Sequence, residues 1–281
     1  MKFSLVLATR NRTREITRCL EGLTAQNLQD FEVIVSDQNG DDRVTRILAP
    51  FAEKWQGRLI HLRCEKGVSH ARNRGLDAAR GEIVGFPDDD CVYPPDLLDR
   101  VARFFDTHPQ YGYLSGRSYF DDGKDAASRH AKAAGPVGRY SIYHQCIEFA
   151  MFVRREKIGA VRFDENMGLG ADTPWQADEG PDLMLRLEAE GVRGYYDPEF
   201  GVWHPRQALT YDDEMIERCH RYACGSGYFL KKHRYPLTFL LYLDARTLTG
   251  VLLGVLTLRP RMAAFYWARI RGRRRGWNGH A

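Results

Sequence analysis

The sequence predicts an α/β protein, with a mostly parallel sheet flanked by helices and a helical C-terminal extension. Two observations predict this class. Short runs of β-branched and aromatic residues alternate with longer segments of helical periodicity through the first half of the chain, and the pattern is helical from Tyr211 onward. We therefore expect a main domain over residues 1–210 and an extension over residues 211–281.

Four short runs in the first half are expected to be strands, and the three segments between them helices. The expected strands are Phe3–Ala8, Phe31–Ser36, Leu59–Arg63 and Glu82–Phe86, and the expected helices are Thr13–Ala25, Asp42–Lys54 and Ser69–Arg80. This alternation is the pattern of βαβ units, so the strands should be parallel. Because ligands bind at the carboxyl ends of such strands, the turns that follow these runs are the candidate site.

The second half is less regular. We expect strands at Tyr111–Leu114, Glu148–Val153 and Arg193–Trp203, a loop-rich stretch over 116–138, and a helix at Pro181–Glu190. Pro236–Leu258 is apolar and has the roughly 20 residues that a membrane span needs. However, Asp244 and Arg246 lie near its centre, where each costs roughly 2.5–3.5 kcal/mol on insertion. We expect this segment to pack against the domain or the bilayer surface.

Composition excludes several classes of protein. With 43% hydrophobic residues and 12 prolines among 281 residues, the chain is neither a disordered polymer nor collagen-like. Its six cysteines are scattered without a CxxC pair, so neither a disulfide framework nor a zinc-ligand pattern is present. The apolar run at Phe3–Ala8 is too short for a signal peptide. We expect a cytoplasmic protein with reduced thiols.

The net charge of +4 is unevenly distributed. Because eight arginines and no acidic residue follow Asp244, residues 1–244 hold 33 basic and 37 acidic residues, a net charge of −4. A basic excess confined to the tail argues against a nucleic-acid partner. We expect residues 236–258 and 259–275 to form helices at an anionic membrane surface, with a packing extension or a homodimer contact as the alternative.

The strongest chemical signal is the triplet Asp88-Asp89-Asp90, which follows an apolar strand directly. Crowded carboxylates repel one another unless a cation lies among them. Mg²⁺ and Mn²⁺ prefer oxygen ligands and commonly share them with substrate phosphates, so the triplet indicates a metal-diphosphate site. The alternative is a solvated acidic turn that caps the next helix.

Four motifs in order make the chain resemble the inverting glycosyltransferases of family 2, which have the GT-A fold with a Rossmann-like sheet. They are Phe3–Arg12, Val33–Asp37, Ala71–Gly75 and the acidic triplet. The resemblance implies a nucleotide-binding half at about 1–115 and an acceptor half at about 116–210. It also implies metal-dependent transfer of a sugar, with inversion, from a nucleotide-diphosphate donor (a UDP-sugar preferred) to the hydroxyl of a glycan or lipid-linked acceptor in cell-surface polysaccharide or glycoconjugate synthesis.

By the same resemblance, a Mn²⁺ or Mg²⁺ ion binds Asp90 directly, with Asp88 and His204 as further ligands and Asp89 in the donor site. A lone histidine is more often structural than a metal ligand. The resemblance assigns the rest of the donor site to Thr9 and Arg12 against the nucleotide, Asp37 on the base, and Arg72 with Asn73 lining the pocket. The alternatives are a capping Asp37 and a helix-surface Arg72. One departure is Gln38, where the family often has a second Asp.

Inverting transfer needs one carboxylate that takes the proton of the acceptor hydroxyl. The family places this base in a Glu-Asp pair at a helix start, and Glu179 aligns with the Glu while Gly180 occupies the Asp position. Glu179 is therefore the first candidate, Asp178 the second and Asp172 the third. The alternative is that these acids only favour the helix N-terminus.

Trp175 lies in a loop rich in Gly and Pro, where it either stacks on a sugar or packs as an ordinary buried side chain. Two rival functions stay open. One is a sugar nucleotidyltransferase, although the Thr9–Arg12 turn lacks the glycines of a phosphate loop. The other is a catalytically inactive module that binds a nucleotide sugar or glycan, which Gly180 favours.

Overall fold

A computed structural model describes residues 1–126, 130–206 and 208–279. The chain divides into two compact units. One unit contains Met1–Phe163 and Leu183–Arg206, and we call it the sheet unit. The other contains Asp164–Asp182 and Gln207–Ala281, and we call it the helical unit. The domain boundary near residue 210 stays a prediction.

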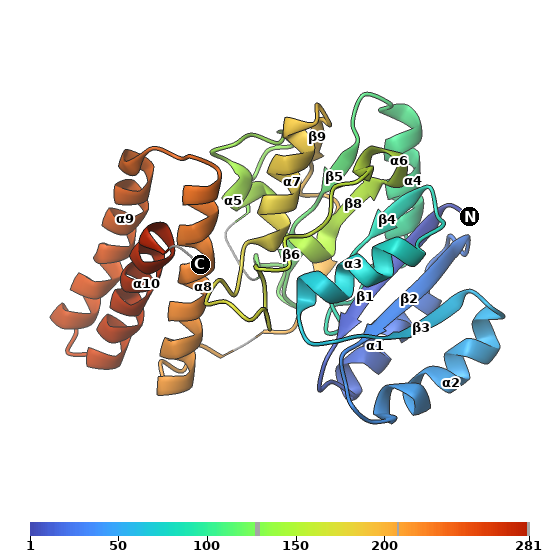
Figure 1. The fold of residues 1–281 in the computed structure, drawn as a ribbon, viewed down its shortest axis with the longest axis horizontal. Coiled ribbons are helices and arrows are strands. Elements are labelled where there is room, and N and C mark those ends of the chain that lie inside the picture. Colours follow the sequence, from blue (N-terminus) through green and yellow to red (C-terminus); the bar gives the residue numbers. More distant parts are fainter. Residues whose placement is uncertain (127–129, 207, 280–281) are drawn as a thin grey trace. The chain divides into compact units, whose positions relative to one another are not determined.

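An eight-stranded sheet, in the order β3-β2-β1-β4-β8-β5-β9-β7, forms the core of the sheet unit (Figure 1). Its strands are β1 (Phe3–Thr9), β2 (Phe31–Asp37), β3 (Leu59–Arg63), β4 (Ile83–Gly85), β5 (Tyr113–Ser115), β7 (Gly135–Pro136), β8 (Met151–Arg154) and β9 (Gly194–Tyr196). Strands β1 to β4 are parallel, and β8 is antiparallel to both of its neighbours. The α/β class predicted from the sequence is confirmed.

Helices connect the parallel strands, as the periodicity predicted. They are α1 (Arg14–Thr24), α2 (Arg43–Trp55), α3 (Val68–Ala78) and α4 (Leu97–Thr107), with the short α5 (Ile142–Gln145) and α6 (Arg155–Ile158) further along. In α1 the buried residues Ile16, Cys19, Leu20 and Leu23 recur three and four positions apart and form the face that joins the core. Gly75 lets α3 lie close to the sheet, because a Cβ there would be 2.4 Å from the Val6 side chain.

Two expected strands differ from the structure. The segment Arg193–Trp203 was expected as one strand, but it forms β9 and then β10 (Val202–Trp203), which pairs with β6 (Ser118–Tyr119) in a separate two-stranded sheet. Pro198 has no N–H to donate, and the Asp197 side chain accepts the N–H of Glu199, so a turn interrupts the strand. The other expected strand is Glu148–Val153. Its first residues, Glu148–Ala150, form a 3₁₀ turn, and the strand begins at Met151.

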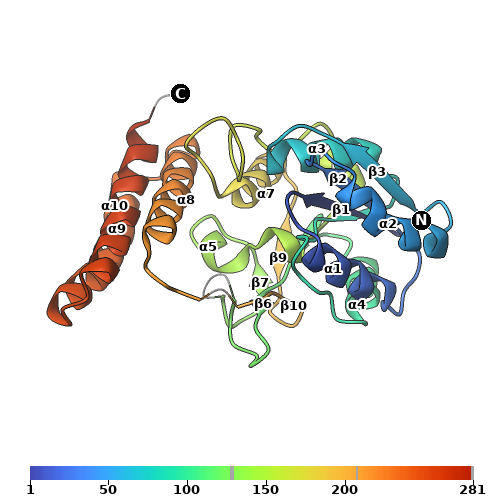
Figure 2. The same ribbon diagram turned by 90° about the horizontal axis from the view of Figure 1, so that it is seen from below.

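The helical unit contains α8 (Asp213–Lys232), α9 (Leu237–Leu256) and α10 (Pro260–Asn278), and α7 (Glu179–Ala189) begins in it. Helix α10 packs against both α8 and α9 (Figures 1 and 2). Glycines allow the close approach of α8 and α10, because a Cβ at Gly276 would lie 1.9 Å from the carbonyl oxygen of Cys224. The helical extension predicted from Tyr211 onward is confirmed.

Candidate active site

Strand register brings the predicted polar turns of the sheet unit together. Thr9 at the end of β1 pairs with Asp37 at the end of β2, and Asp37 pairs in turn with Arg63 at the end of β3. On the other side, Ala8 forms a parallel bridge with Asp88. The carboxyl ends of these strands therefore form one continuous polar edge, as expected for a parallel sheet.

The three carboxylates of the triplet have different partners. Asp88 accepts a hydrogen bond from Arg72 at 3.0 Å, and Asp89 accepts one from the Thr9 hydroxyl at 2.7 Å. Asp90 accepts a hydrogen bond from Arg12 at 3.2 Å, and the same guanidinium lies 3.8 Å from Asp89. The triplet is thus surrounded by cations from the β1 turn and from α3, and it is not a solvated helix cap.

The Asp89 carboxyl has a shifted pKa. Burial raises its pKa to about 7, and repulsion from Asp88 and Asp90 acts in the same direction. The Thr9 hydrogen bond and the Arg12 charge oppose this shift. The raised pKa therefore reflects burial first and the neighbouring carboxylates second.

His204 lies beside Asp90 because Trp203 and Val92 form an antiparallel bridge. Its Nδ1 donates to the Pro205 carbonyl oxygen at 2.9 Å, and its Nε2 lies 3.5 Å from Asp90 Oδ1. The ring also stacks on Phe149, with the centroids 5.2 Å apart. An acceptor nitrogen that faces a carboxylate oxygen suits a shared cation.

These donors fit a divalent metal only in part. Over residues 1–126, 130–206 and 208–279, no three His, Cys, Asp or Glu side chains converge closely enough to enclose an ion. Mg²⁺ is usually held by one or two carboxylates together with substrate phosphates. An ion next to Asp90 and His204 would therefore depend on a bound diphosphate for its remaining ligands.

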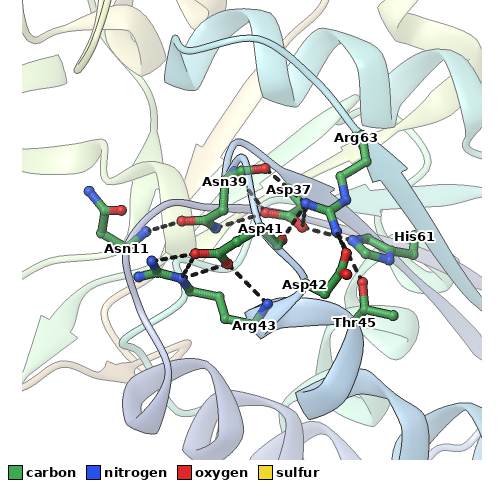
Figure 3. A network of polar contacts seen from close by, with 9 residues as sticks. All are labelled: Asn11, Asp37, Asn39, Asp41, Asp42, Arg43, Thr45, His61 and Arg63. Carbon is green, nitrogen blue, oxygen red and sulfur yellow. Dashed lines mark hydrogen bonds and ion pairs between the residues drawn. The ribbon is translucent and has the colours of Figure 1, made fainter.

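Asp37 is fully buried at the centre of a polar network at the end of β2 (Figure 3). Its carboxylate accepts hydrogen bonds from the Asn39 backbone at 2.9 Å, the Asn39 side chain at 2.7 Å and His61 at 2.9 Å. Arg63 lies 3.4 Å away. Asp37 thus organises the turn over residues 38–42 and does not cap a helix.

The Arg72-Asn73 pair on α3 is buried and not on the helix surface. Arg72 reaches Asp88, and its guanidinium lies over the Phe163 ring. Asn73 donates to the Phe163 carbonyl at 3.0 Å and accepts from the Phe163 N–H at 2.8 Å. Asn73 therefore fixes the backbone at Phe163, while Arg72 points to the triplet. Gln38, the departure from the family pattern, accepts the N–H of Gly67 just before α3.

The second group of predicted residues belongs to the helical unit, where α8 holds residues 164–182. Trp175 is buried and stacks on Tyr228, with ring centroids 3.7 Å apart and an angle of 7° between the rings. The backbone of Ala177 lies against Gly225, where a Cβ would be 2.5 Å from the Ala177 carbonyl oxygen. The structure thus has Trp175 in the packed arrangement that was the alternative to sugar stacking.

Further along α8, two basic residues bind the acids of this segment. Lys232 lies 2.6 Å from Asp164 and 2.7 Å from Asp182, and His233 lies 2.8 Å from Asp182. Asp182 has no exposed surface, so its charge depends on these contacts. This position of Asp182 agrees with a structural role.

The two leading candidates for the catalytic base are neighbours with different environments. Asp178 has a left-handed backbone (φ 65°), and burial of its carboxylate raises its pKa to about 6 against the opposing hydrogen bond from Ser226. Although the residue as a whole is only partly buried, its Oδ2 is enclosed, and no donor among the described residues reaches it. Glu179 begins α7 and is 8% exposed, whereas the third candidate, Asp172, is exposed.

Sequence reasoning missed several residues of these networks. His61 and Arg63 were inside a strand that was predicted correctly, and the parallel register Asp37–Arg63 was the signal that could have found them. Ser226 lies in the Gly225-Ser226-Gly227 segment of α8 and contacts Asp178 through its hydroxyl. No local pattern in the sequence marks this contact.

The sequence model of Glycosyl transferase family 2 matches residues 4–167, which is more than half of the chain. The chain is 36% identical over 108 residues to a PGL/p-HBAD biosynthesis glycosyltransferase of Mycobacterium bovis, covering 38% of this chain and 42% of that protein. It therefore spans less than half the length of the curated relatives that it matches.

Two solved structures are similar over nearly the whole chain. One is S. aureus TarS 1–349 in complex with UDP-GlcNAc, with a TM-score of 0.60, 18% identity, and coverage of 99% of this chain and 90% of that one. The other is the mannosyltransferase PcManGT from Pyrobaculum calidifontis in complex with GDP-Man and Mn²⁺, with a TM-score of 0.65, 18% identity, and coverage of 98% and 86%. These similarities confirm the predicted GT-A fold.

Proposed function

Because the chain belongs to glycosyl transferase family 2, we propose that it transfers a sugar from a nucleotide-diphosphate donor to an acceptor hydroxyl. One observation carries the proposal. One edge of the parallel sheet brings together the residues that we assign to recognition of such a donor. They are Asp37, Thr9, Arg12 and the acid triplet. This edge is where α/β sheets bind their ligands.

The donor that we propose is a UDP-sugar, with the base bound near Asp37. The carboxylate of Asp37 already accepts from Asn39 and His61, so a base N–H would replace its longest contact, the 3.4 Å ion pair with Arg63. TarS, which has a similar fold, is described with UDP-GlcNAc, and PcManGT with GDP-Man. A donor screen by thermal shift, with and without Mn²⁺, tests this choice, because a bound ligand raises apparent stability.

Metal dependence is part of the proposal. Asp90 and His204 would hold a Mn²⁺ or Mg²⁺ ion, with Asp88 next to it. When bound, the ion neutralises charge that develops on the leaving diphosphate. Arg12 would add positive charge next to the diphosphate oxygens, because its guanidinium lies at this edge beside Asp89 and Asp90.

We propose transfer with inversion, in which one carboxylate takes the acceptor proton while the anomeric carbon is displaced from the diphosphate. Glu179 is the proposed base and Asp178 the second candidate. We propose a glycan or lipid-linked acceptor in cell-surface glycoconjugate synthesis, in line with a relative named for PGL/p-HBAD biosynthesis. The cytoplasmic location of the enzyme is a further part of the proposal.

Turnover separates this function from its rivals. A transferase hydrolyses or transfers one donor sugar in the presence of Mn²⁺, and Asp90→Asn and Glu179→Gln each lower that rate by about 10²-fold or more. An inactive module would bind the donor in the thermal-shift screen and never turn it over. A sugar nucleotidyltransferase would release diphosphate from a nucleoside triphosphate and a sugar phosphate. Either of the last two results would replace the proposal.

A further inference from the structure

Helix α9 of the helical unit buries the polar side chains of Asp244 and Thr247 and leaves most of its large apolar side chains exposed. The buried residues of this helix are Leu240, Asp244, Thr247 and Gly254. Its exposed residues include six large apolar side chains that are 41–59% exposed: Leu237, Leu241, Leu248, Leu252, Leu253 and Val255. A helix on the surface of a soluble protein normally shows the opposite arrangement.

The charge of Asp244 is neutralised within the unit. Its two carboxylate oxygens accept from Arg273 at 2.7 Å and from Arg274 at 2.8 Å, both on α10. The side chains of Asp244 and Arg273 are each only 6% exposed. The sequence counted Asp244 as a cost of spanning the bilayer, and the structure shows that its carboxylate faces α10.

Small residues make the contact between α9 and α10. Gly250 lies against the ring of Tyr266, and a Cβ at Gly254 would be 2.6 Å from the Ala263 backbone nitrogen. Two glycines four positions apart allow helices to approach closely without leucines at the interface. The exposed leucines of α9 are therefore left for another contact.

Five of the exposed side chains form one face, which we call the leucine face: Leu237, Leu241, Leu248, Leu252 and Val255. They follow one another at spacings of four, seven, four and three residues, which places them on one side of the helix. Scattered exposed apolar residues are ordinary, but a continuous apolar face along a whole helix marks an interaction surface. Among the described residues, α9 is the single helix long and apolar enough to cross a membrane.

We propose that the leucine face docks in the plane of an anionic membrane surface. Charge complementarity selects this partner: eight arginines and no acidic residue follow Asp244, and Arg259, directly after α9, is exposed. Basic side chains beside an apolar helix face are typical of helices that lie at the interface of anionic lipids.

The same arginines disfavour two other partners of the leucine face, a second copy of this chain and the interior of the bilayer. A second copy of this chain would bring the same arginines against the first, and α9 and α10 hold no acid besides Asp244, which Arg273 and Arg274 already neutralise. A spanning orientation would place exposed Arg246 near the bilayer centre and would take the arginine-rich α10, which packs on α9, with it. Docking in the interface avoids both costs.

The test is flotation of the full chain with vesicles of phosphatidylcholine, with and without phosphatidylglycerol, at low and high salt. We expect the wild type to float only with the anionic vesicles and to be released by salt. The variant Leu241→Ser/Leu252→Ser should lose at least about tenfold in bound fraction, because each leucine no longer contributes apolar burial. The matched control is Leu209→Ser, which changes a leucine of similar exposure outside α9.

Two further measurements keep the test independent of folding and of the proposed reaction. Thermal unfolding of the double variant should match the wild type, because both leucines are exposed. Transfer to a soluble acceptor should also be unchanged, so failure of docking and failure of the proposed function give different results. Equal flotation of the wild type and the double variant would overturn the proposal. So would a wild-type dimer in light scattering that the double variant abolishes, since the leucine face would then bind a second copy.

Discussion

The Asp88–Asp90 triplet and the acids of residues 164–182 are both crowded carboxylates, but their counter-charges come from different places. The triplet is matched by Arg12 and Arg72, which lie on the β1 turn and on α3 of the same βαβ framework. The acids of residues 164–182 are matched by Lys232 and His233, at the end of a helix that comes much later in the chain.

The two sets of carboxylates can also be compared by how much of each side chain is exposed to solvent. In the triplet, the Asp88 side chain keeps 36% of its surface exposed, whereas Asp89 and Asp90 keep 13% and 9%, no more than Asp164 with 16%. Asp182 is completely buried and Asp164 is mostly covered. We infer that the triplet serves binding, while Lys232 and its acids hold the segment that carries Asp178 and Glu179. Four substitutions test this division.

The largest effect should come from Asp90→Asn. Loss of this carboxylate removes a proposed metal ligand, and we expect kcat/KM to fall by about 10²–10³-fold with little change in the midpoint of thermal unfolding. Steady-state transfer with Mn²⁺ measures the rate, and Asp99→Asn on the exposed face of α4 is the matched control. Full activity of Asp90→Asn would contradict the assignment of the triplet to binding.

The next effect should come from Lys232→Met. It removes one cation from two acids, and breaking a buried ion pair typically costs 3–5 kcal/mol. Because Lys232 is 24% exposed, we expect the free energy of unfolding to fall by about 2–3 kcal/mol. Urea unfolding measures the change, with the exposed neighbour Lys231→Met as the control. If both variants lose the same free energy of unfolding, the ion pairs of Lys232 with Asp164 and Asp182 do not stabilise residues 164–182.

Asp178→Asn should stabilise the protein. The folded pKa of about 6 lies above the usual aspartate pKa of 3.8, so the wild type loses stability as pH rises from about 4 to about 6. Asparagine keeps the left-handed backbone and the Ser226 partner without the buried charge. We expect a gain of about 1–3 kcal/mol above pH 6 that disappears near pH 4, measured by urea unfolding across this range.

Activity of the same variant decides between the two base candidates. If Glu179 is the base, Asp178→Asn keeps most of its turnover while Glu179→Gln loses it. The opposite result would move the catalytic role to Asp178. A variant that is less stable than the wild type at pH 7 would show that the Asp178 carboxylate is satisfied when ionised.

The smallest effect should come from Ser226→Ala. It removes one hydrogen bond to Asp178, so we expect a loss of about 1 kcal/mol in the free energy of unfolding and a further rise in the pKa of Asp178. The double variant with Asp178→Asn should be non-additive, because the two side chains are in contact. Additive effects would mean that Ser226 acts on another group.

The sequence predicted the first half of the fold. It also predicted that Thr9, Asp37 and the triplet lie close together at one edge of the sheet. This prediction succeeded because the alternation of strand and helix determines a parallel sheet, and the carboxyl ends of parallel strands lie at one edge. Residue roles there stay predictions, although the contacts of Arg72 and Asn73 exclude a helix-surface position.

The contacts of the helical unit could not be predicted in the same way. Lys232 and His233 resemble any basic last turn of a helix, which the helix dipole favours without a specific partner. Asp244 was taken as an isolated charge because its partner Arg273 lies 29 residues away. Such pairs depend on which helix faces meet, and periodicity alone does not specify that.

The interleaving of the two units also has a consequence for biosynthesis. The chain leaves the sheet unit at Phe163, returns at Leu183 and leaves it again after Arg206. Ser226 and Lys232 are therefore translated about 50 residues after the acids that they bind. At about 5–20 residues per second, the nascent segment 164–182 waits roughly 2–10 s on the ribosome without these partners. A ribosome-stalled chain that ends before α8 should accordingly leave this segment open to protease, whereas the parallel strands β1 to β4 can already pair.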